Sequence, residues 1–192
     1  MIAIIKYNAG NIQSVQNALN RLGYKSVLTD DRNTIFSAEK VIFPGVGEAS
    51  TAMQYLNKKR LDELIPTLNQ PFLGICLGLQ LMCKSTEEGN TTCLGIFDTD
   101  VKLFPPEDNV PHMGWNNFDT LDGQLLNGIS KNDDVYYVHS YYAEQCCNTT
   151  ATCHYIKPFS AVLQKDNFYA TQFHPEKSAE VGEQILKNFL EL

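Results

Sequence analysis

The first 95 residues alternate between short apolar runs and stretches in which apolar side chains recur every three or four positions. The short runs are typical of buried strands, and the longer spacing is typical of amphipathic helices. The expected strands span residues 2–7, 25–29, 41–43 and 72–75. The expected helices span residues 12–22, after a turn that ends at Asn11, then 49–56, 61–68 and a segment directly after Cys76. This alternation predicts a mostly parallel sheet with helices on both faces.

After residue 95 the apolar runs follow one another without long helical stretches between them. The expected strands span residues 101–104, 115–118, 135–141, 151–156, 160–164 and 168–172. Several of these strands are expected to be antiparallel, and a closing amphipathic helix is expected over residues 179–192. The sequence shows no repeat, low-complexity segment or linker, so we expect residues 1–192 to form one α/β domain.

Composition narrows the class of protein. A formal net charge of −7 and the lack of basic runs argue against nucleic acid or an anionic membrane as partner. No apolar stretch approaches the length of a membrane helix, and the N-terminus lacks a signal sequence, so we expect a cytoplasmic protein. The six cysteines form no C-x-x-C pair, and Cys146-Cys147 and Cys153-His154 lack partners at ligand spacing. We therefore expect reduced thiols and no metal site.

The most informative stretch is 72–81, where a predicted strand enters a helix through Gly74-Ile75-Cys76-Leu77-Gly78. This is the Gly-x-nucleophile-x-Gly pattern of a sharp elbow, with a thiol at its corner. The glycines leave room for a strained turn, and the N–H groups at the start of the helix favour a thiolate. Alone, the pattern is more often a structural turn with a buried cysteine than a catalytic one.

A second segment, His174-Pro175-Glu176, supplies the base that a cysteine nucleophile needs. Proline keeps the preceding residue extended, and in an extended segment residues two apart point to the same side. His174 and Glu176 are therefore expected to face one site. There the carboxylate can orient the imidazole and stabilise the imidazolium that forms when it takes the thiol proton. Together with the elbow, this segment favours a catalytic triad over an exposed loop.

A third segment, Val41–Gly47, is an apolar strand that ends in the flexible turn Pro44-Gly45-Val46-Gly47. Acyl transfer to a thiol generates an oxyanion that backbone N–H groups of such a turn can stabilise, although a plain turn is commoner on its own. In an open α/β sheet, sites lie beyond the carboxyl ends of the strands. This turn, Cys76 and His174 each follow a predicted strand, so we expect all three at one edge of the sheet.

These segments resemble the motifs of the class I, triad-type glutamine amidotransferases. Within that class the chain is similar to the family of glutaminase subunits of imidazole glycerol phosphate synthase. The narrower similarity rests on residues 44–47, 111–116, 138–142 and 171–178, which together extend over nearly the whole chain in the family's order. The run Pro-His-Met-Gly-Trp-Asn at 111–116 is the most specific of them. The resemblance implies a flavodoxin-like α/β fold.

The resemblance also implies a role for each matching residue. Cys76 would attack the side-chain amide of glutamine, His174 would serve as base and then protonate the departing ammonia, and Glu176 would orient His174. The residues implied to bind L-glutamine or its oxyanion are Val46, Gly47, Gln80, Glu88, Ser140 and Tyr141. Gln80 follows Cys76 by one helical turn, which places both on one helix face. No cofactor is expected.

The same resemblance implies a partner. Ammonia would pass through a tunnel into a (β/α)8 cyclase subunit, within a heterodimer that serves histidine biosynthesis. The matching docking positions are Asn11, Met113, Trp115 and Lys177, near the mouth of the site. One loop departs from the family pattern, since residues 7–11 read Tyr-Asn-Ala-Gly-Asn where Tyr-Gly-x-Gly-Asn is common. Asparagine tolerates left-handed backbone angles nearly as glycine does.

Other interpretations stay open at the level of sequence. A paralogous amidotransferase that supplies ammonia to a surface-sugar pathway would share these motifs. A stand-alone cysteine hydrolase of similar fold would need neither Gln80 as a glutamine ligand nor a docking face. A non-catalytic module that keeps the fold would have no reason to retain Cys76, His174 and Glu176 together.

Overall fold

A computed structural model of the chain describes residues 1–7 and 12–192. The predicted turn at residues 8–11, and Asn11 as a docking residue, lie outside the described residues. The strands of the central sheet are β1 (Ile2–Ile5), β2 (Ser26–Thr29), β3 (Lys40–Phe43), β4 (Phe72–Ile75), β9 (Thr120–Leu121), β12 (Thr149–Tyr155), β13 (Lys157–Lys165) and β14 (Phe168–Thr171). The α-helices are α1 (Ile12–Arg21), α2 (Arg32–Ser37), α3 (Ala49–Lys59), α4 (Leu61–Leu64), α5 (Leu77–Met82) and α6 (Ala179–Glu191).

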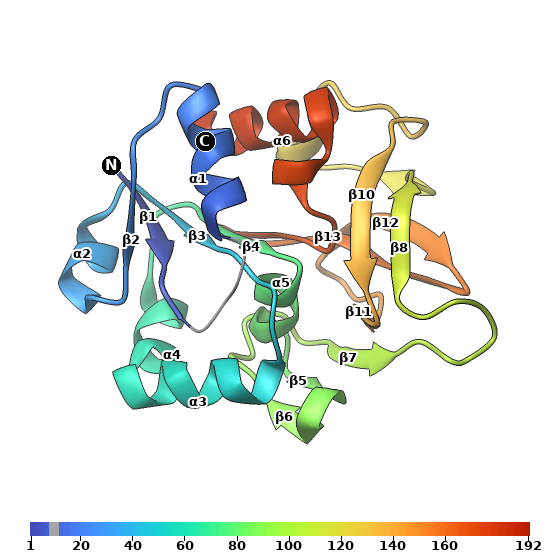
Figure 1. Cartoon of the computed structure of the whole chain (residues 1–192), viewed down its shortest axis with the longest axis horizontal. Helices are drawn as coiled ribbons and strands as arrows, with labels where there is room; N and C mark the ends of the chain where they lie inside the picture. The colour runs from blue at the N-terminus through green and yellow to red at the C-terminus, as the bar shows by residue number, and fades with distance from the viewer. Residues whose placement is uncertain (8–11) are drawn as a thin grey trace.

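The central sheet has eight strands in the order β2-β1-β3-β4-β14-β13-β12-β9 (Figure 1). The pairs from β2 to β14 are parallel, and those from β14 to β9 are antiparallel. This arrangement confirms the predicted α/β fold, with a mostly parallel sheet and antiparallel strands in the second half. It also places β14, from the end of the chain, directly beside β4, with Ala170 opposite Gly74.

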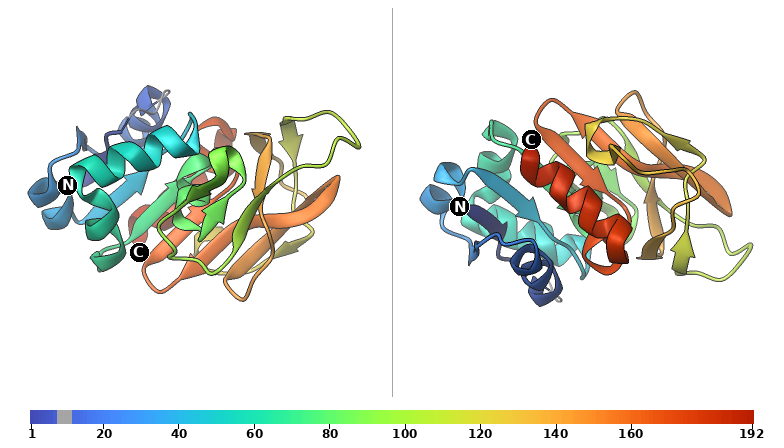
Figure 2. Two further views of the ribbon diagram at one scale, coloured as in Figure 1. Left: turned by 90° about the horizontal axis from the view of Figure 1, so that it is seen from below. Right: turned by 90° about the horizontal axis from the view of Figure 1, so that it is seen from above.

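The apolar side chains form two cores, one on each face of the sheet, because successive residues of a strand point to opposite faces. In β1, Ala3 and Ile5 pack in the cluster that includes residues of α2, α3, α4 and α5. Ile2 and Ile4 pack in the other cluster, with α1 and α6. Figure 2 shows α3 across one face in the view from below and α6 across the other in the view from above. The predicted helices on both faces are confirmed.

The strand predicted over residues 135–141 is broken at Ser140, and its two halves join different sheets. One sheet pairs β10 (Val135–His139) with β8 (His112–Asn116), which replaces the strand predicted at 115–118. The other runs β11 (Tyr141–Ala143), β7 (Asp100–Leu103), β5 (Ser85–Thr86) and β6 (Thr91–Thr92). The Ser140 carbonyl accepts a hydrogen bond from Phe104 N at 3.0 Å. Because apolar residues continue on both sides of Ser140, the sequence pattern does not reveal the switch.

Two helical segments differ from the prediction. The helix expected over 61–68 ends at Leu64 and continues as a 3₁₀ turn over Ile65–Thr67, because Pro66 has no N–H for an α-helical bond. Helix α2 was missed, since it is short and buries only Ile35. Its start has a capping signal that could have revealed it, because the Asp31 side chain accepts from Thr34 N at 2.8 Å. No helix among the described residues is long and apolar enough to cross a membrane.

The contact between β3 and the start of α5 has no room for a side chain. A Cβ atom on Gly78 would lie 2.1 Å from the Phe43 carbonyl oxygen. Helix propensity alone favours alanine over glycine by about 1 kcal/mol, so a loss of stability on Gly78→Ala would report this contact. We expect the variant to lose about 1–3 kcal/mol or more of unfolding free energy, the usual range for overpacking, measured by urea denaturation.

The matched control for this prediction is Gly128→Asn. A Cβ on Gly128 would meet nothing within 4 Å, and asparagine tolerates the positive φ of this position. We expect the control to unfold within about 0.5 kcal/mol of the parent. A Gly78→Ala protein as stable as the control would contradict the close packing of β3 on α5.

Candidate active site

Cys76 occupies the corner between β4 and α5. Its backbone has φ of 52° and ψ of −106°, a conformation that L-residues rarely adopt. The Cys76 N–H donates to the Thr171 carbonyl at 2.7 Å, so the pairing of β4 with β14 continues to the corner itself. A strained nucleophile position held by its surroundings is the geometry expected of an elbow.

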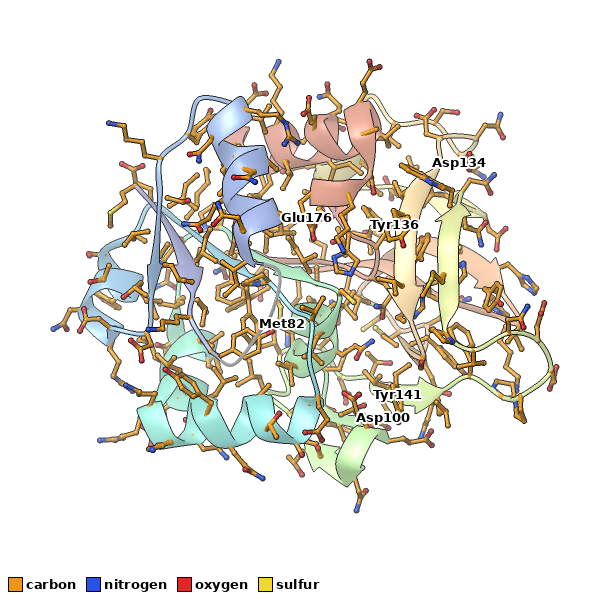
Figure 3. All side chains as sticks on the ribbon, viewed as in Figure 1. Met82, Asp100, Asp134, Tyr136, Tyr141 and Glu176 are labelled. Atoms are coloured by element: carbon orange, nitrogen blue, oxygen red, sulfur yellow. The ribbon has the colours of Figure 1, made fainter. Side chains whose placement is uncertain are left out.

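Glycines make the corner possible by removing side chains from three crowded positions. A Cβ on Gly74 would lie 2.5 Å from the sulfur of Met82, which Figure 3 labels on α5. A Cβ on Gly45 would lie 2.6 Å from Gly78 N. The elbow and the Gly45 turn therefore pack against each other through backbone atoms, and a larger residue at any of the three positions would push them apart.

His174 and Glu176 come together at the carboxyl end of β14. The His174 backbone is extended, with φ of −100° and ψ of 95°, and the residues after it form a 3₁₀ turn over Pro175–Lys177. His174 Nδ1 lies 2.7 Å from Glu176 Oε1, and both side chains are buried. The His174 N–H donates to the Tyr136 carbonyl at 2.9 Å, which fixes this segment against β10. The predicted pairing of imidazole and carboxylate is thus present in the structure.

The free nitrogen of His174 faces the nucleophile. Nε2 is buried and has no hydrogen-bond partner among the described residues. Burial lowers the pKa of His174, but the adjacent Cys76 sulfur and the hydrogen-bonded Glu176 outweigh it and raise the pKa to about 10. An imidazolium beside Cys76 favours the thiolate, which is the reactive form of cysteine. The site is therefore arranged to hold a protonated imidazole beside the Cys76 sulfur.

Two further groups surround the Cys76 sulfur. Gln172 Nε2 points at it from 3.7 Å, and the Val138 carbonyl lies 3.9 Å from it. Gln172 is fully buried, and its Oε1 accepts from Gln80 Nε2 at 3.2 Å. The sequence motifs did not assign a role to Gln172, although it lies two residues before His174 at the same strand end. That spacing was the available signal.

The predicted substrate-binding residues line one cavity of about 320 Å³ beside Cys76. Its walls contain Gly45, Val46, Gly47, Cys76, Leu77, Gln80, Glu88, Pro111, Val138, His139, Ser140 and Tyr141. All six residues expected to bind glutamine or its oxyanion are among them. Figure 3 shows Tyr141 on the β7 side of the strand ends and Glu176 on the side of α1 and α6.

Gln80 and Glu88 already make contacts within the cavity wall. Gln80 Nε2 donates to the Tyr141 carbonyl at 2.9 Å, so this nitrogen holds the wall and leaves substrate contact to other atoms. Glu88 Oε2 accepts from Ala49 N at 2.8 Å. Burial raises the pKa of Glu88, and the nearby Glu48 adds to this effect. Glu88 lines the cavity, and its carboxyl group can accept hydrogen bonds from a cationic amino group bound there.

The turn expected to supply the oxyanion donor presents a carbonyl instead. The Leu77 N–H, next to the nucleophile, donates to the Gly45 carbonyl at 3.4 Å. In an elbow of this type, the N–H after the nucleophile is one of the two oxyanion donors. The Gly45 carbonyl thus occupies one oxyanion donor, the Leu77 N–H. The other donor, the Val46 N–H of the same peptide, points away from the site because the N–H and C=O of a trans peptide point in opposite directions. Gly47 beside it has φ of 143°, which glycine adopts freely.

Two of the predicted docking residues, Trp115 and Lys177, contact Tyr136, which was not predicted, and Met113 lies on the same strand as Trp115. Met113 and Trp115 on β8 are 63% and 55% exposed. The Trp115 ring lies 5.8 Å from that of Tyr136 on β10, and Lys177 Nζ lies 5.9 Å from the centre of the Tyr136 ring. Figure 3 labels Tyr136 on β10. We call Met113, Trp115, Tyr136 and Lys177 the docking cluster. Among the described residues, no group of three or more His, Cys, Asp or Glu side chains is placed to hold a metal.

The proximity of Cys76 and His174 has a measurable consequence. Because the Cys76 sulfur is the largest cause that raises the His174 pKa, we expect Cys76→Ala to lower that pKa from about 10 toward the ordinary value of about 6.5. An NMR titration of the histidine ring signals would measure it. The matched control is Cys147→Ala at an exposed thiol, which should leave the His174 pKa unchanged. An unchanged pKa in Cys76→Ala would mean that the two side chains do not interact.

Comparisons with known proteins agree with this geometry. The family model described as Glutamine amidotransferase class-I matches residues 3–192. The chain is 59% identical over 194 residues to "Imidazole glycerol phosphate synthase subunit HisH" of Bacteroides fragilis (strain YCH46), which covers 100% of this chain and 99% of the relative. The protein of the same name from Blochmanniella floridana is 47% identical over 194 residues, with the same coverage of both chains.

Solved structures agree on the fold. A structure described as a glutamine amidotransferase has a TM-score of 0.78 at 15% identity, covering 100% of this chain and 98% of the other. The structure of PurLQS from Thermotoga maritima has a TM-score of 0.72 at 15% identity, covering 99% and 97%. The full-length match to the family model and the identity to the curated relatives establish the family. The chain belongs to the class-I glutamine amidotransferases and, within them, to the family of HisH subunits of imidazole glycerol phosphate synthase.

Proposed function

We propose that this protein is the glutaminase subunit of an imidazole glycerol phosphate synthase. It hydrolyses L-glutamine to glutamate and ammonia, and it delivers the ammonia to a (β/α)8 cyclase subunit in histidine biosynthesis. The observation that supports this most directly is the buried array of Cys76, His174 and Glu176 beside a cavity that contains all the expected glutamine-binding residues. The HisH name of the full-length relatives supports the choice of pathway.

The reaction proceeds through a thioester. The Cys76 thiolate attacks the carboxamide carbon of glutamine, and the carbonyl oxygen becomes an oxyanion. His174, as imidazolium, donates its Nε2 proton to the amide nitrogen, which leaves as ammonia while the C–N bond breaks. Neutral His174 then takes a proton from water, whose oxygen attacks the thioester and releases glutamate and the thiolate. Glu176 holds the ring through Nδ1 and stabilises its charged form.

The Gly45–Val46 peptide acts as the switch of this reaction. In the orientation of the structure, the Gly45 carbonyl occupies Leu77 N–H and would repel an oxyanion. A flip of this peptide frees Leu77 N–H and turns Val46 N–H toward the site. One oxyanion donor is worth about 3–4 kcal/mol, or a hundredfold or more in rate. Without its partner the protein is therefore a slow glutaminase, and binding of the partner with its ligand favours the flipped state.

The docking cluster is the surface that meets the cyclase subunit. Exposed aromatic and methionine side chains are residue types enriched at protein interfaces, and a polar side chain such as that of Lys177 fits the rim of one. Met113 lies opposite Val138 in the pairing of β8 with β10, and Val138 lines the glutamine cavity. The partner would therefore cover the mouth through which ammonia leaves. Asn11 would extend this surface from outside the described residues.

The remaining interpretations are less well supported. A surface-sugar paralogue would share the triad, but relatives at 59% and 47% identity over the full chain have the HisH name. A stand-alone hydrolase would not need a switch that blocks its own oxyanion site. We also place the protein in the cytoplasm, where thiols stay reduced, because all six cysteines are free in the described chain.

Replacement of the nucleophile tests the proposed function. We expect Cys76→Ala, in complex with the cyclase subunit, to lose glutamine-dependent product formation by several orders of magnitude, because the thioester cannot form. The same complex should make product from added ammonium salt at the parent's rate, since that chemistry belongs to the other chain. Cys147→Ala is the matched control and should keep both activities. Substantial glutamine turnover by the Cys76→Ala protein would refute the assignment.

A second variant tests the switch. Gly47 has φ of 143° in the orientation of the structure, which is costly for a β-branched residue, so valine at this position distorts the turn and disturbs the equilibrium between its two orientations. We expect Gly47→Val to reduce the stimulation of glutamine hydrolysis by the ligand-bound cyclase at least tenfold, with a smaller effect on the basal rate of the uncomplexed protein. Gly95→Val, at a positive φ away from the site, controls for strain alone. Equal glutamine turnover by the uncomplexed parent protein and by the ligand-bound complex would eliminate the switch.

A further inference from the structure

The alternation of side chains along a strand divides the run at residues 111–116 into two faces, and docking accounts for only one of them. Met113 and Trp115 point outward from β8 as part of the docking cluster. His112 lies on the opposite face and is only 4% exposed, and Asn116 shares that face. These two inward residues have no role in the chemistry or in docking.

His112 is enclosed by rings. It stacks between Tyr155, with ring centres 4.0 Å apart, and Tyr137, at 4.8 Å. In the pairing of β8 with β10 it lies opposite His139, which is 5% exposed. His112 Nδ1 is 3.1 Å from His139 Nε2. Two imidazoles in hydrogen-bond contact inside an aromatic core require that one nitrogen donate and the other accept.

The surrounding acceptor and donor groups determine which nitrogen of each ring bears the proton. His139 Nδ1 lies 2.8 Å from the Tyr141 carbonyl, so this nitrogen bears the proton. Its Nε2 then accepts, which requires the proton of His112 to be on Nδ1. His112 Nε2 is left as an acceptor, and Asn116 Nδ2 approaches it at 3.4 Å. Burial lowers the pKa of His112 to about 4 and that of His139 to about 3, so both rings are neutral near pH 7.

This chain of donors ends on the wall of the glutamine cavity. The Tyr141 carbonyl accepts from His139 on one side and from Gln80 Nε2, at 2.9 Å, on the other. Both lone pairs of this oxygen are therefore used within the protein. Tyr141 and Ser140, which line the cavity, lie where the chain passes from the β10–β8 sheet to the sheet of β11. On its β7 side this segment is held by the ladder of β11 with β7 and by the bond from Phe104 N to the Ser140 carbonyl. The bonds from His139 and Gln80 to the Tyr141 carbonyl hold it on the other side.

We propose that His112 and His139 are positioning residues, a pair of neutral imidazoles with fixed tautomers that holds the Ser140–Tyr141 wall of the glutamine cavity in place from the docking strand β8. The pair connects β8, which presents Met113 and Trp115, to the Tyr141 carbonyl, which also accepts from Gln80. A displacement of β8 by a docked partner therefore reaches the cavity wall through two hydrogen bonds. The identity of the ligand as glutamine rests on the proposed function, whereas the tautomers and the bond to Tyr141 do not.

Two substitutions at His139 separate the halves of this chain. In His139→Asn, the amide nitrogen can take the place of Nδ1 and still donate to Tyr141. In His139→Gln, the amide reaches the position of Nε2 and can accept from His112, but the Tyr141 carbonyl loses one of its two donors and keeps only Gln80. We expect His139→Gln to raise the KM for glutamine about tenfold in the complex with the cyclase subunit, the effect of removing one of the two hydrogen bonds that hold the Tyr141 carbonyl. Its kcat with ammonium salt should be unchanged, and His139→Asn should restore the KM to within about threefold of the parent.

The matched control is His154→Gln, because His154 is exposed and only its backbone carbonyl contacts Asn116. The positioning role would be overturned if both His139 variants had the same KM for glutamine as the parent. It would also be overturned if both variants lost affinity equally and in proportion to their loss of thermal stability.

An NMR measurement of histidine ring nitrogens in the parent protein tests the tautomers directly. Protons on Nδ1 of both rings, unchanged down to about pH 5, are expected. Titration of either ring near pH 6.5 would overturn the proposal even if a variant fails to fold. If the parent complex had no glutaminase activity, the proposed function would be refuted. The tautomers of His112 and His139 could still be tested, because the NMR measurement does not depend on that activity.

Discussion

The parallel pairing of β4 with β14 is the constraint on which the site depends. It aligns Thr171 with Ile75 and extends through the hydrogen bond from Cys76 N to the Thr171 carbonyl. Each strand is followed at once by its functional segment, so the register of the pair fixes the separation of nucleophile and base. A slip by one residue would turn the side chains of one strand to the other face of the sheet. The two apolar cores, one on each face, prevent that slip because each depends on the same alternation.

Close backbone packing then links the elbow to the oxyanion turn. Because Gly45, Gly74 and Gly78 have no side chains, β3 and β4 approach the start of α5 closely enough for Leu77 N–H to meet the Gly45 carbonyl. The same contact that completes the packing also occupies the position where an oxyanion would bind. In the proposed switch, packing of the unliganded fold and activity of the site therefore compete at the Gly45–Val46 peptide. Under that proposal, a partner that binds the flipped orientation of this peptide more tightly would shift the equilibrium toward the active state.

The sequence revealed the parts of this site whose chemistry is local and missed those that depend on register. Cys76 with its glycines, and His174 with Glu176, are short segments that indicate a catalytic site when they occur together, and the family resemblance assigns their roles. Tyr136 and the pair of His112 with His139 depend instead on the cross-strand pairing of β8 with β10, in which His112 and His139 lie 27 residues apart in the sequence. Gln172 reaches the Cys76 sulfur only because β14 lies beside β4. The switch of sheets at Ser140 was invisible because the apolar pattern continues through it.

The two-stranded sheet of β8 and β10 connects the docking cluster on its outer face to the active site. Its outer face presents the docking cluster, and its inner face contains the imidazole pair. Its strand β10 also supplies the Val138 carbonyl beside the Cys76 sulfur and the Tyr136 carbonyl that fixes His174. One small sheet thus contacts the nucleophile, the base and the cavity wall at once. Since it has only two strands, its position depends on what packs against each face, and a partner on the outer face necessarily changes the balance of forces on the inner one. The residues proposed to recognise a partner are therefore on the same small sheet as the backbone groups that contact Cys76 and His174, so a movement of this sheet would reach both.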